Sequence, residues 1–188
     1  GIPMSLEPNF VKSFGYVKKA AALANRDLGV LDPKIADAIA GACDRLIAGE
    51  MRDQFVTDFI QGGAGTSTNM NANEVIANRA LELSDHPRGE YHHVHPNNHV
   101  NLSQSTNDVY PTAMKLALHA QIEGLARAMS DLAAAFLAKG DDFCTFIKMG
   151  RTQLQDAVPM TLGQEFTAFG HTILEDVQRL GEAQALIR

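Results

Sequence analysis

The sequence has 188 residues, of which 45% are hydrophobic and 20% charged, so it can bury the core of one large domain. A net charge of −6 and the lack of any basic run argue against nucleic acid or an anionic membrane surface as a partner. No apolar stretch is long enough to span a membrane, no signal peptide is visible, and the two cysteines lack the spacing of a disulfide framework or zinc site. We therefore expect a cytoplasmic protein.

Helical spacing of apolar residues dominates the first half of the chain. It predicts helices over 8–28 and 33–50, and Asp32, directly before a proline, is the expected N-cap of the second. Residues 51–73 are expected to form a loop-like connection, and 74–84 a further helix. A polar, histidine-rich stretch follows up to the second half of the chain.

Two long apolar seams characterise the second half. The pattern predicts one helix from Asn107 to about Lys139, with Pro111 accommodated in its first turn, then a loop over 140–160. A second seam begins after Thr161, which with Gln164 resembles a capping box. Residues of the first seam step by four and three: Leu118, Ile122, Leu125, Met129, Leu132 and Phe136. Such seams are typical of helices packed in a bundle and require partners.

These patterns together predict an all-α fold. We expect an N-terminal helical domain over 1–106 that carries the binding loops, followed over 107–188 by the first long helices of a central helical bundle. The second seam continues to the last residue without a capping glycine or proline, so the chain is interpreted as part of a longer protein, an oligomer, or both.

A run of glycines followed by small polar side chains is the most informative segment. It contains Gly62, Gly63 and Gly65 and continues with candidate ligand-binding residues, which are Thr66, Ser67, Thr68 and Asn69. Glycine lets the backbone approach a ligand closely, and uncharged donors at a helix start add hydrogen bonds to the positive end of the helix dipole. This chemistry suits a small, doubly negative organic acid, although a glycine turn followed by a helix cap would produce the same pattern.

Two more segments repeat this combination of small polar residues before a helix. Residues 101–108 include Ser105, Thr106 and Asn107, and either Ser105 or Thr106 is the expected cap of the long helix. Residues 150–159 precede the last helix and include Arg151, Thr152 and Gln153. Together the three segments favour a pocket of neutral donors plus one arginine that binds a dicarboxylate, and nothing in the sequence calls for a cofactor.

Four strings resemble the aspartase/fumarase superfamily, in the family's order. They are Gln61-Gly-Gly-Ala-Gly-Thr-Ser-Thr-Asn-Met-Asn71, His95-Pro-Asn97, Ser103-Gln-Ser-Thr-Asn-Asp108 and Lys148-Met-Gly-Arg-Thr-Gln-Leu-Gln-Asp-Ala-Val-Pro-Met-Thr-Leu-Gly-Gln-Glu165. The resemblance covers nearly the whole chain. It implies a homotetramer with a central helical bundle, active sites built from three subunits, and anti elimination that yields fumarate through an aci-carboxylate intermediate.

The resemblance also assigns roles to residues. Thr66 with its three successors, Ser105 to Asn107, and Thr152 match substrate-binding positions, whereas His95 and Asn97 match a secondary acid-binding site. Gln153 stands where fumarases place a histidine, and it resembles one group of aspartases. The resemblance therefore implies elimination of ammonia from L-aspartate. The family's catalytic serine loop does not occur in this sequence, so no catalytic base is assigned and the chain by itself is expected to be inactive.

Two alternatives remain open for the function. The string at His95 to Asn97 favours a class II fumarase, which interconverts malate and fumarate. The chain could also be an inactive helical assembly fragment whose polar segments are only helix caps. His92, His93, His95 and His99 lie close in sequence, but with no cysteine or carboxylate among them and no regular helical spacing we expect no metal site.

Overall fold

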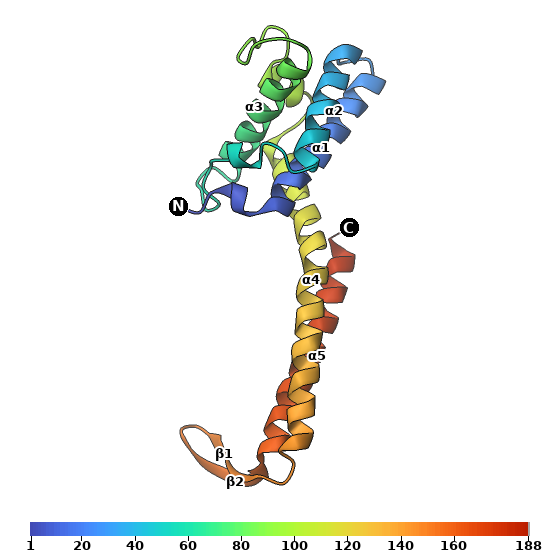
Figure 1. The fold of residues 1–188 in the computed structure, drawn as a ribbon. Helices are drawn as coiled ribbons and strands as arrows, with labels where there is room; N and C mark the ends of the chain where they lie inside the picture. Colours follow the sequence, from blue (N-terminus) through green and yellow to red (C-terminus); the bar gives the residue numbers. More distant parts are fainter. Residues whose placement is uncertain (188) are drawn as a thin grey trace. The chain divides into compact units, whose positions relative to one another are not determined.

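The computed structural model describes residues 1–187, which form two compact units that divide after Ala117. In chain order the elements are η1 (Met4–Leu6), α1 (Pro8–Asp27), α2 (Pro33–Ile47), η2 (Arg52–Gln54), α3 (Thr66–Leu83), η3 (Pro96–Val100), α4 (Thr106–Asp142), β1 (Ile147–Thr152), β2 (Gln155–Thr161) and α5 (Leu162–Leu186) (Figure 1). The all-α fold expected from the sequence is confirmed, and the only sheet among the described residues is the antiparallel pair β1–β2.

The first unit is held together by the packing of α1 against α2 and of α2 against α3. Its core consists of fully buried apolar side chains, among them Phe14, Ile39, Leu46, Ile76 and Leu81. Burial of a side chain of this size stabilises the folded state by roughly 1.5–3 kcal/mol. The apolar residues that recur at helical spacing in the sequence therefore lie on the helix faces that form the core of the first unit.

The cap expected for α2 is confirmed. The Asp32 carboxylate accepts hydrogen bonds from the backbone N–H groups of Lys34 at 2.8 Å and Ile35 at 3.4 Å. These two donors have no partner within the helix, so the aspartate satisfies them and fixes where the helix begins.

In the second unit, the C-terminal part of α4 lies beside α5 (Figure 1). The ring of Phe136 on α4 lies 5.7 Å from the rings of both Phe166 and Phe169 on α5. Two glycines allow the close approach: a Cβ atom on Gly163 would stand 2.4 Å from the carbonyl oxygen of Gly140. The capping box of Thr161 and Gln164 is present and starts α5.

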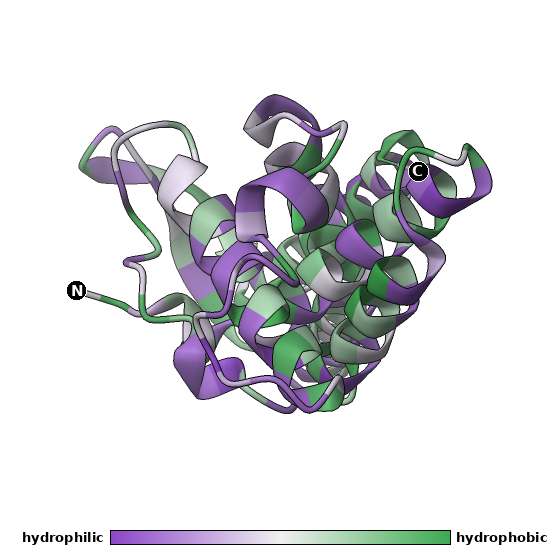
Figure 2. Ribbon diagram, turned by 90° about the horizontal axis from the view of Figure 1, so that it is seen from above, coloured by the Kyte–Doolittle hydropathy of each residue, from purple (hydrophilic) through white to green (hydrophobic). Residues whose placement is uncertain are grey.

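Part of the apolar seam of α4 is left exposed by the residues that the structure describes. Leu118, Leu125 and Leu132, each seven residues apart, are 44%, 52% and 48% exposed. No helix of the described residues is both long and apolar enough to cross a membrane, and Figure 2 shows hydrophilic residues interspersed with hydrophobic ones along the helices.

Three local expectations were wrong. The helix expected from residue 74 begins at Thr66, and the loop expected over 140–160 contains the β1–β2 hairpin. Pro111 lies inside α4, beyond the first turn, because the helix begins at Thr106. In the first two cases the local residue preferences differ from the structure. Ser, Thr and Asn are poor helix formers, yet they begin α3, and the turn of the β1–β2 hairpin carries neither glycine nor asparagine.

The expected domain boundary at residue 106 coincides with the start of α4, whereas the compact units divide eleven residues later, within that helix. The division into a binding domain over 1–106 and a bundle domain over 107–188 stays a prediction.

Candidate functional site

The glycine-rich loop ends at Gly65, which is the N-cap of α3. Gly65 has a φ of 86°, and a Cβ atom at this position would stand 2.2 Å from the ring of Tyr110. Only glycine satisfies both the left-handed backbone and the close approach of the ring. The hydroxyl of the next residue, Thr66, donates a hydrogen bond to the carbonyl oxygen of Gly63 at 2.8 Å. The loop is therefore a defined structure.

The four candidate residues at the start of α3 divide into two pairs. Thr66 and Ser67 are exposed, so their side chains face solvent, whereas the backbone N–H groups of Thr66 and Thr68 are paired with the Gly63 carbonyl oxygen and the Gln61 side chain. Thr68 and Asn69 are fully buried. The hydroxyl of Thr68 lies within hydrogen-bond distance of the side chain of Gln61. The first pair is available to a ligand, and the second pair holds the loop in place.

The second candidate segment begins α4, with Ser105 as its cap. The Ser105 hydroxyl accepts a hydrogen bond from the backbone N–H of Asn107 at 3.2 Å, and the Asp108 carboxylate accepts one from the backbone N–H of Ser105 at 3.3 Å. Both Ser105 and Asn107 are exposed, and Thr106 is half-buried. The helix start therefore presents polar side chains at the positive end of the helix dipole, as α3 does.

The structure brings these two segments together within the first unit. The Asn69 amide donates to the Thr106 hydroxyl at 3.0 Å and to the side-chain oxygen of Asn101 at 3.2 Å. Asn73, one turn further along α3, donates to the same oxygen of Asn101 at 3.2 Å. Two helix N-termini rich in neutral donors are thus joined by side-chain hydrogen bonds, and buried amides are costly to leave unpaired.

Lys18 completes this network, and the sequence analysis missed it. The fully buried Lys18 ammonium donates to the side-chain oxygens of Asn101 and Gln104, each at 3.0 Å. Burial lowers the pKa of Lys18 to about 7, and the nearby thiol of Cys43 only partly opposes this. A lysine within an apolar helix pattern was the available signal, because a buried lysine needs polar partners.

The third candidate segment lies in the second unit. Thr152 ends β1, and Gln153 and Leu154 form the two-residue turn to β2, with φ values of 51° and 61°. Two successive left-handed residues match the type I′ hairpin turn, which normally uses asparagine and glycine. Each non-glycine residue in this conformation costs on the order of 1 kcal/mol. The turn thus holds Gln153 and an entirely exposed Leu154 in a strained conformation.

A salt bridge stabilises the base of this hairpin. The Lys148 ammonium lies 2.6 Å from the Glu165 carboxylate, which joins β1 to the first turn of α5. Arg151, expected in the binding pocket, is exposed and lies 3.6 Å from the Asp156 carboxylate across the two strands. The hairpin therefore projects Thr152 and Gln153 as exposed side chains within its own unit.

His95 and Asn97 lie at the start of η3. The Nδ1 atom of His95 accepts hydrogen bonds from the backbone N–H groups of Asn97 at 3.0 Å and Asn98 at 3.1 Å. The Nδ1 atom of His99 in turn accepts one from the backbone N–H of His95 at 2.9 Å. Because Nδ1 is an acceptor in both rings, the proton of each neutral imidazole is on Nε2, and that atom of His95 can donate to an acid.

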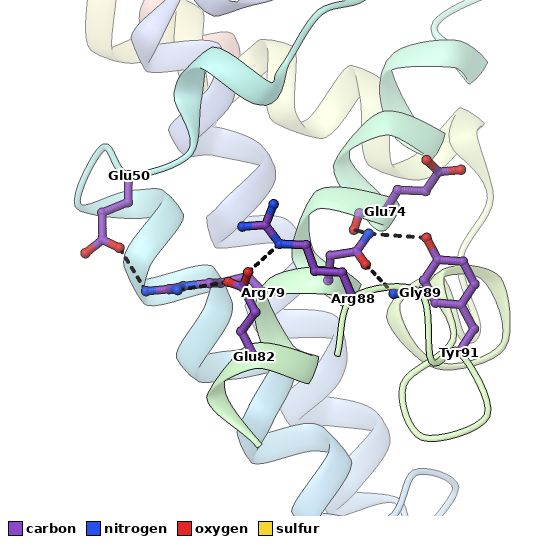
Figure 3. Close-up of polar contacts among 8 residues, drawn as sticks. Glu50, Glu74, Arg79, Glu82, Arg88, Gly89 and Tyr91 are labelled. Carbon is purple, nitrogen blue, oxygen red and sulfur yellow. Dashed lines mark hydrogen bonds and ion pairs between the residues drawn. The ribbon is translucent and has the colours of Figure 1, made fainter. Parts of the chain in front are cut away.

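A separate pocket of about 690 Å³ lies in the first unit, away from the candidate residues. Figure 3 shows its ion pairs: Arg79 binds Glu50 at 3.3 Å and Glu82 at 3.0 Å, and Arg88 also pairs with Glu82. These hydrogen bonds lower the pKa of Glu82. The lining carboxylates outnumber the two guanidinium groups, and both guanidinium groups are already paired with Glu50 or Glu82, so this pocket is poorly suited to a dicarboxylate.

Comparisons with known proteins agree on one family. Residues 4–188 match the model of a family described as Lyase. Aspartate ammonia-lyases from Helicobacter pylori strain J99 and Pseudomonas canavaninivorans are 56% and 58% identical over 96% of the chain. Among solved structures, a fumarate lyase:delta crystallin from Brucella melitensis has a TM-score of 0.87 at 56% identity, and a class II fumarase from Schistosoma mansoni 0.82 at 38%; each match covers 99% of this chain.

The matches leave out much of each relative. The chain spans 39% and 38% of the two ammonia-lyases, 43% of the Brucella structure and 39% of the Schistosoma structure.

Proposed function

Because this chain belongs to the aspartase/fumarase superfamily of lyases, we propose that it is part of an aspartate ammonia-lyase. The enzyme would eliminate ammonia from L-aspartate and release fumarate. Identity to proteins of that name reaches 58%, against 38% to the class II fumarase. The chain spans about two fifths of these relatives, so the proposal concerns the whole protein.

One observation carries the proposal: the hydrogen bond of 3.0 Å between Asn69 and Thr106. It joins the N-termini of α3 and α4, each of which exposes small uncharged donors, namely Thr66 and Ser67 on one and Ser105 and Asn107 on the other. Such a pair of helix starts suits a dianion, because the positive ends of two helix dipoles and exposed neutral donors stabilise negative charge without a fixed cation. Thr68, Asn69 and Thr106 support this surface from beneath.

The elimination needs stabilisation of a short-lived charge. A base takes a proton from Cβ, and the electron pair of that C–H bond is delocalised into the adjacent carboxylate as an aci-carboxylate dianion. The pair then forms the double bond while the C–N bond breaks and its electrons leave with the amine, which departs as ammonia. Preorganised donors directed at the charged carboxylate lower the barrier, and loss of one such donor typically costs about 10²–10³-fold in rate.

Thr152 and Gln153 extend the proposed substrate contacts to the hairpin. The strained turn at Gln153 supports a functional role, because unfavourable backbone conformations cluster at ligand-binding sites. The catalytic base belongs to residues outside this sequence. The uncovered leucines of α4 support assembly into a homotetramer with composite active sites, in which these separate pieces would be completed by other subunits.

A secondary acid-binding site at His95 and Asn97 accompanies the proposal. The Nε2–H group of His95 and the exposed amide of Asn97 are both available donors for a carboxylate. The same segment supports fumarase as the second candidate function.

The test uses the full-length protein and follows the absorbance of fumarate from L-aspartate and from L-malate in parallel. We expect fumarate from aspartate alone. Fumarate from malate alone would replace the proposal by fumarase, and activity with neither substrate would favour an inactive assembly protein. The 188-residue chain alone, as the control, should produce no fumarate; turnover by it would overturn the assignment of the base to residues outside this sequence.

A further inference from the structure

The segment that follows α3 contains a group of side chains to which the proposed function assigns no role. It is anchored to α3 at two points: the backbone N–H of His86 donates to the carbonyl oxygen of Leu81 at 2.9 Å, and that of Gly89 donates to the side chain of Asn78 at 2.9 Å. The Asn78 amide also donates to the hydroxyl of Tyr91 at 3.2 Å. These bonds hold the segment in one conformation.

Three donor atoms of different residues converge on this segment. The Oε2 atom of Glu90 lies 3.8 Å from Nδ1 of His86 and 4.0 Å from Nε2 of His93, and all three atoms lie within 4.8 Å of one another. The three residues lie in the turns between α3 and η3, where the fold of the segment, and not a helix, brings their side chains together. We propose that His86, Glu90 and His93 form a binding site for a divalent transition-metal ion such as Zn²⁺.

The separations fit such an ion. Zn²⁺ binds imidazole nitrogen and carboxylate oxygen at about 2.0–2.2 Å, which in tetrahedral geometry places neighbouring donor atoms roughly 3.3–3.6 Å apart. The separations of 3.8 Å and 4.0 Å from the Glu90 oxygen need to contract by only a few tenths of an ångström, and the two imidazole nitrogens lie within 4.8 Å of each other. Two imidazoles and one carboxylate suit Zn²⁺ better than Mg²⁺ or Ca²⁺, which prefer sites made of oxygen atoms. The three side chains are 35%, 39% and 41% exposed, so water can complete the coordination shell.

The side chains around the three donor atoms also bear on the site. The rings of His86 and His93 are stacked, with centroids 3.7 Å apart and planes at 12°, and the ring of His92 lies 4.0 Å from that of His93. Because an ion lies in the plane of each imidazole that binds it, one of the stacked rings must turn about its side-chain torsions for both to reach the same ion. Arg88, the nearest cationic side chain in sequence, is paired with Glu82 and does not neutralise Glu90.

The cluster differs from the four histidines between His92 and His99 that lie close in sequence and have no carboxylate among them. It combines His93 with two residues nearer to α3, one of which is a glutamate. His95 and His99 commit their Nδ1 atoms to backbone N–H groups. A bound ion would fasten residues 86–93 together directly before the segment at His95.

The test is titration of the metal-stripped full-length protein with Zn²⁺ alone, followed calorimetrically, and it does not depend on any enzymatic activity. We expect one strong site per chain in the wild type. His86→Gln, Glu90→Gln and His93→Gln should each weaken it by more than tenfold, because even loss of a residue that only supports a ligand costs about 10–100-fold. The matched control is His92→Gln, which removes a neighbouring imidazole from outside the donor set and should retain the site.

An equal loss in His92→Gln, or wild-type binding no tighter than in His86→Gln, would overturn the proposal. A second measurement covers the case in which a variant folds poorly: crystals of the wild-type protein soaked in Zn²⁺ should show an anomalous scattering peak among the three side chains. A peak only elsewhere would also overturn it. Neither result bears on whether the protein releases fumarate, so the two proposals can fail separately.

Discussion

At the scale of single residues, the first unit has an unusual buried group. Lys18 is completely enclosed, and its partners are amide oxygens of Asn101 and Gln104. Amides accept hydrogen bonds but carry no charge, so they compensate the cost of burying an ammonium only in part. This residue therefore makes folding sensitive to pH.

We expect the stability of the first unit to rise with pH between 7 and 10.5. The folded-state pKa of Lys18 is about 7 and its unperturbed value 10.5, so in this window the unfolded chain binds more protons. The gain from pH 7 to pH 9 is about 2 kcal/mol. Urea denaturation of the wild type and of Lys18→Met at both pH values measures it. The variant should lack the gain. An equal increase in the free energy of unfolding from pH 7 to pH 9 in both proteins would contradict the assignment of this effect to Lys18.

A substitution of Thr66 tests whether the start of α3 binds substrate or only caps the helix. Its exposed hydroxyl donates only to the carbonyl oxygen of Gly63 in the free protein, and under the proposed function it contacts substrate. Thr66→Ala should lower kcat/KM for aspartate by roughly 100-fold with little change in Tm. Thr172→Ala is the matched control, because that exposed hydroxyl also bonds to a backbone carbonyl, of Ala168. If Thr66→Ala loses stability in proportion to activity, a capping role explains the residue.

At the scale of elements, glycines decide how closely α4 and α5 approach in the second unit. A Cβ atom on Gly163 would meet the backbone of Gly140 and of Cys144, at 2.4 Å from the oxygen and 2.7 Å from Cα. Backbone cannot move aside as a flexible side chain does, so the helices would have to separate. Gly181, on the same helix, has no atom within 4 Å of its Cβ position.

Alanine at these two glycines should therefore have opposite effects. Gly163→Ala should destabilise the fold by about 1–3 kcal/mol, the usual cost of overpacking. Gly181→Ala should stabilise it by about 0.5–1 kcal/mol, since alanine loses less backbone entropy in a helix. Denaturant midpoints of the two variants measure the difference, and a shift in the same direction for both would contradict the described packing.

The hairpin turn offers a test of strain. Replacing its two left-handed residues by the favoured pair, in Gln153→Asn/Leu154→Gly, should raise the free energy of unfolding by roughly 1–2 kcal/mol. Leu154→Ala, which removes the exposed side chain and leaves the backbone strain, should produce no such gain. We expect the stabilised hairpin to cost activity, because the proposed function places Gln153 in contact with substrate. Denaturation and turnover on the same preparations measure both effects.

At the scale of the whole molecule, the helices of the second unit display apolar surface that a single copy of the chain does not cover. Leu118, Leu125 and Leu132 recur at intervals of seven residues, as in a helical bundle. Two helices bury little surface from water, whereas four copies could enclose these side chains. The exposed leucines support the proposed homotetramer, in which the number of copies stays a prediction.

Assembly should therefore depend on this seam. Leu125→Glu in the full-length protein should shift the molecular mass in light scattering from four copies towards one, because four carboxylates would be brought into an apolar contact. Leu125→Met, which preserves volume and polarity, should remain assembled. Full assembly of Leu125→Glu would show that the exposed seam is not the interface.

The sequence by itself determined the helical class, the starts of α2 and α5, and the three polar segments, because periodicity and caps are local features. Only the tertiary structure decided the rest. It joined Asn69 to Thr106, supplied Lys18 from a helix some 80 residues away in sequence, and combined His86, Glu90 and His93. It also formed a hairpin at Gln153 against local turn preference. These features arise from contacts between distant residues and from packing that overrides propensity, neither of which a linear pattern records.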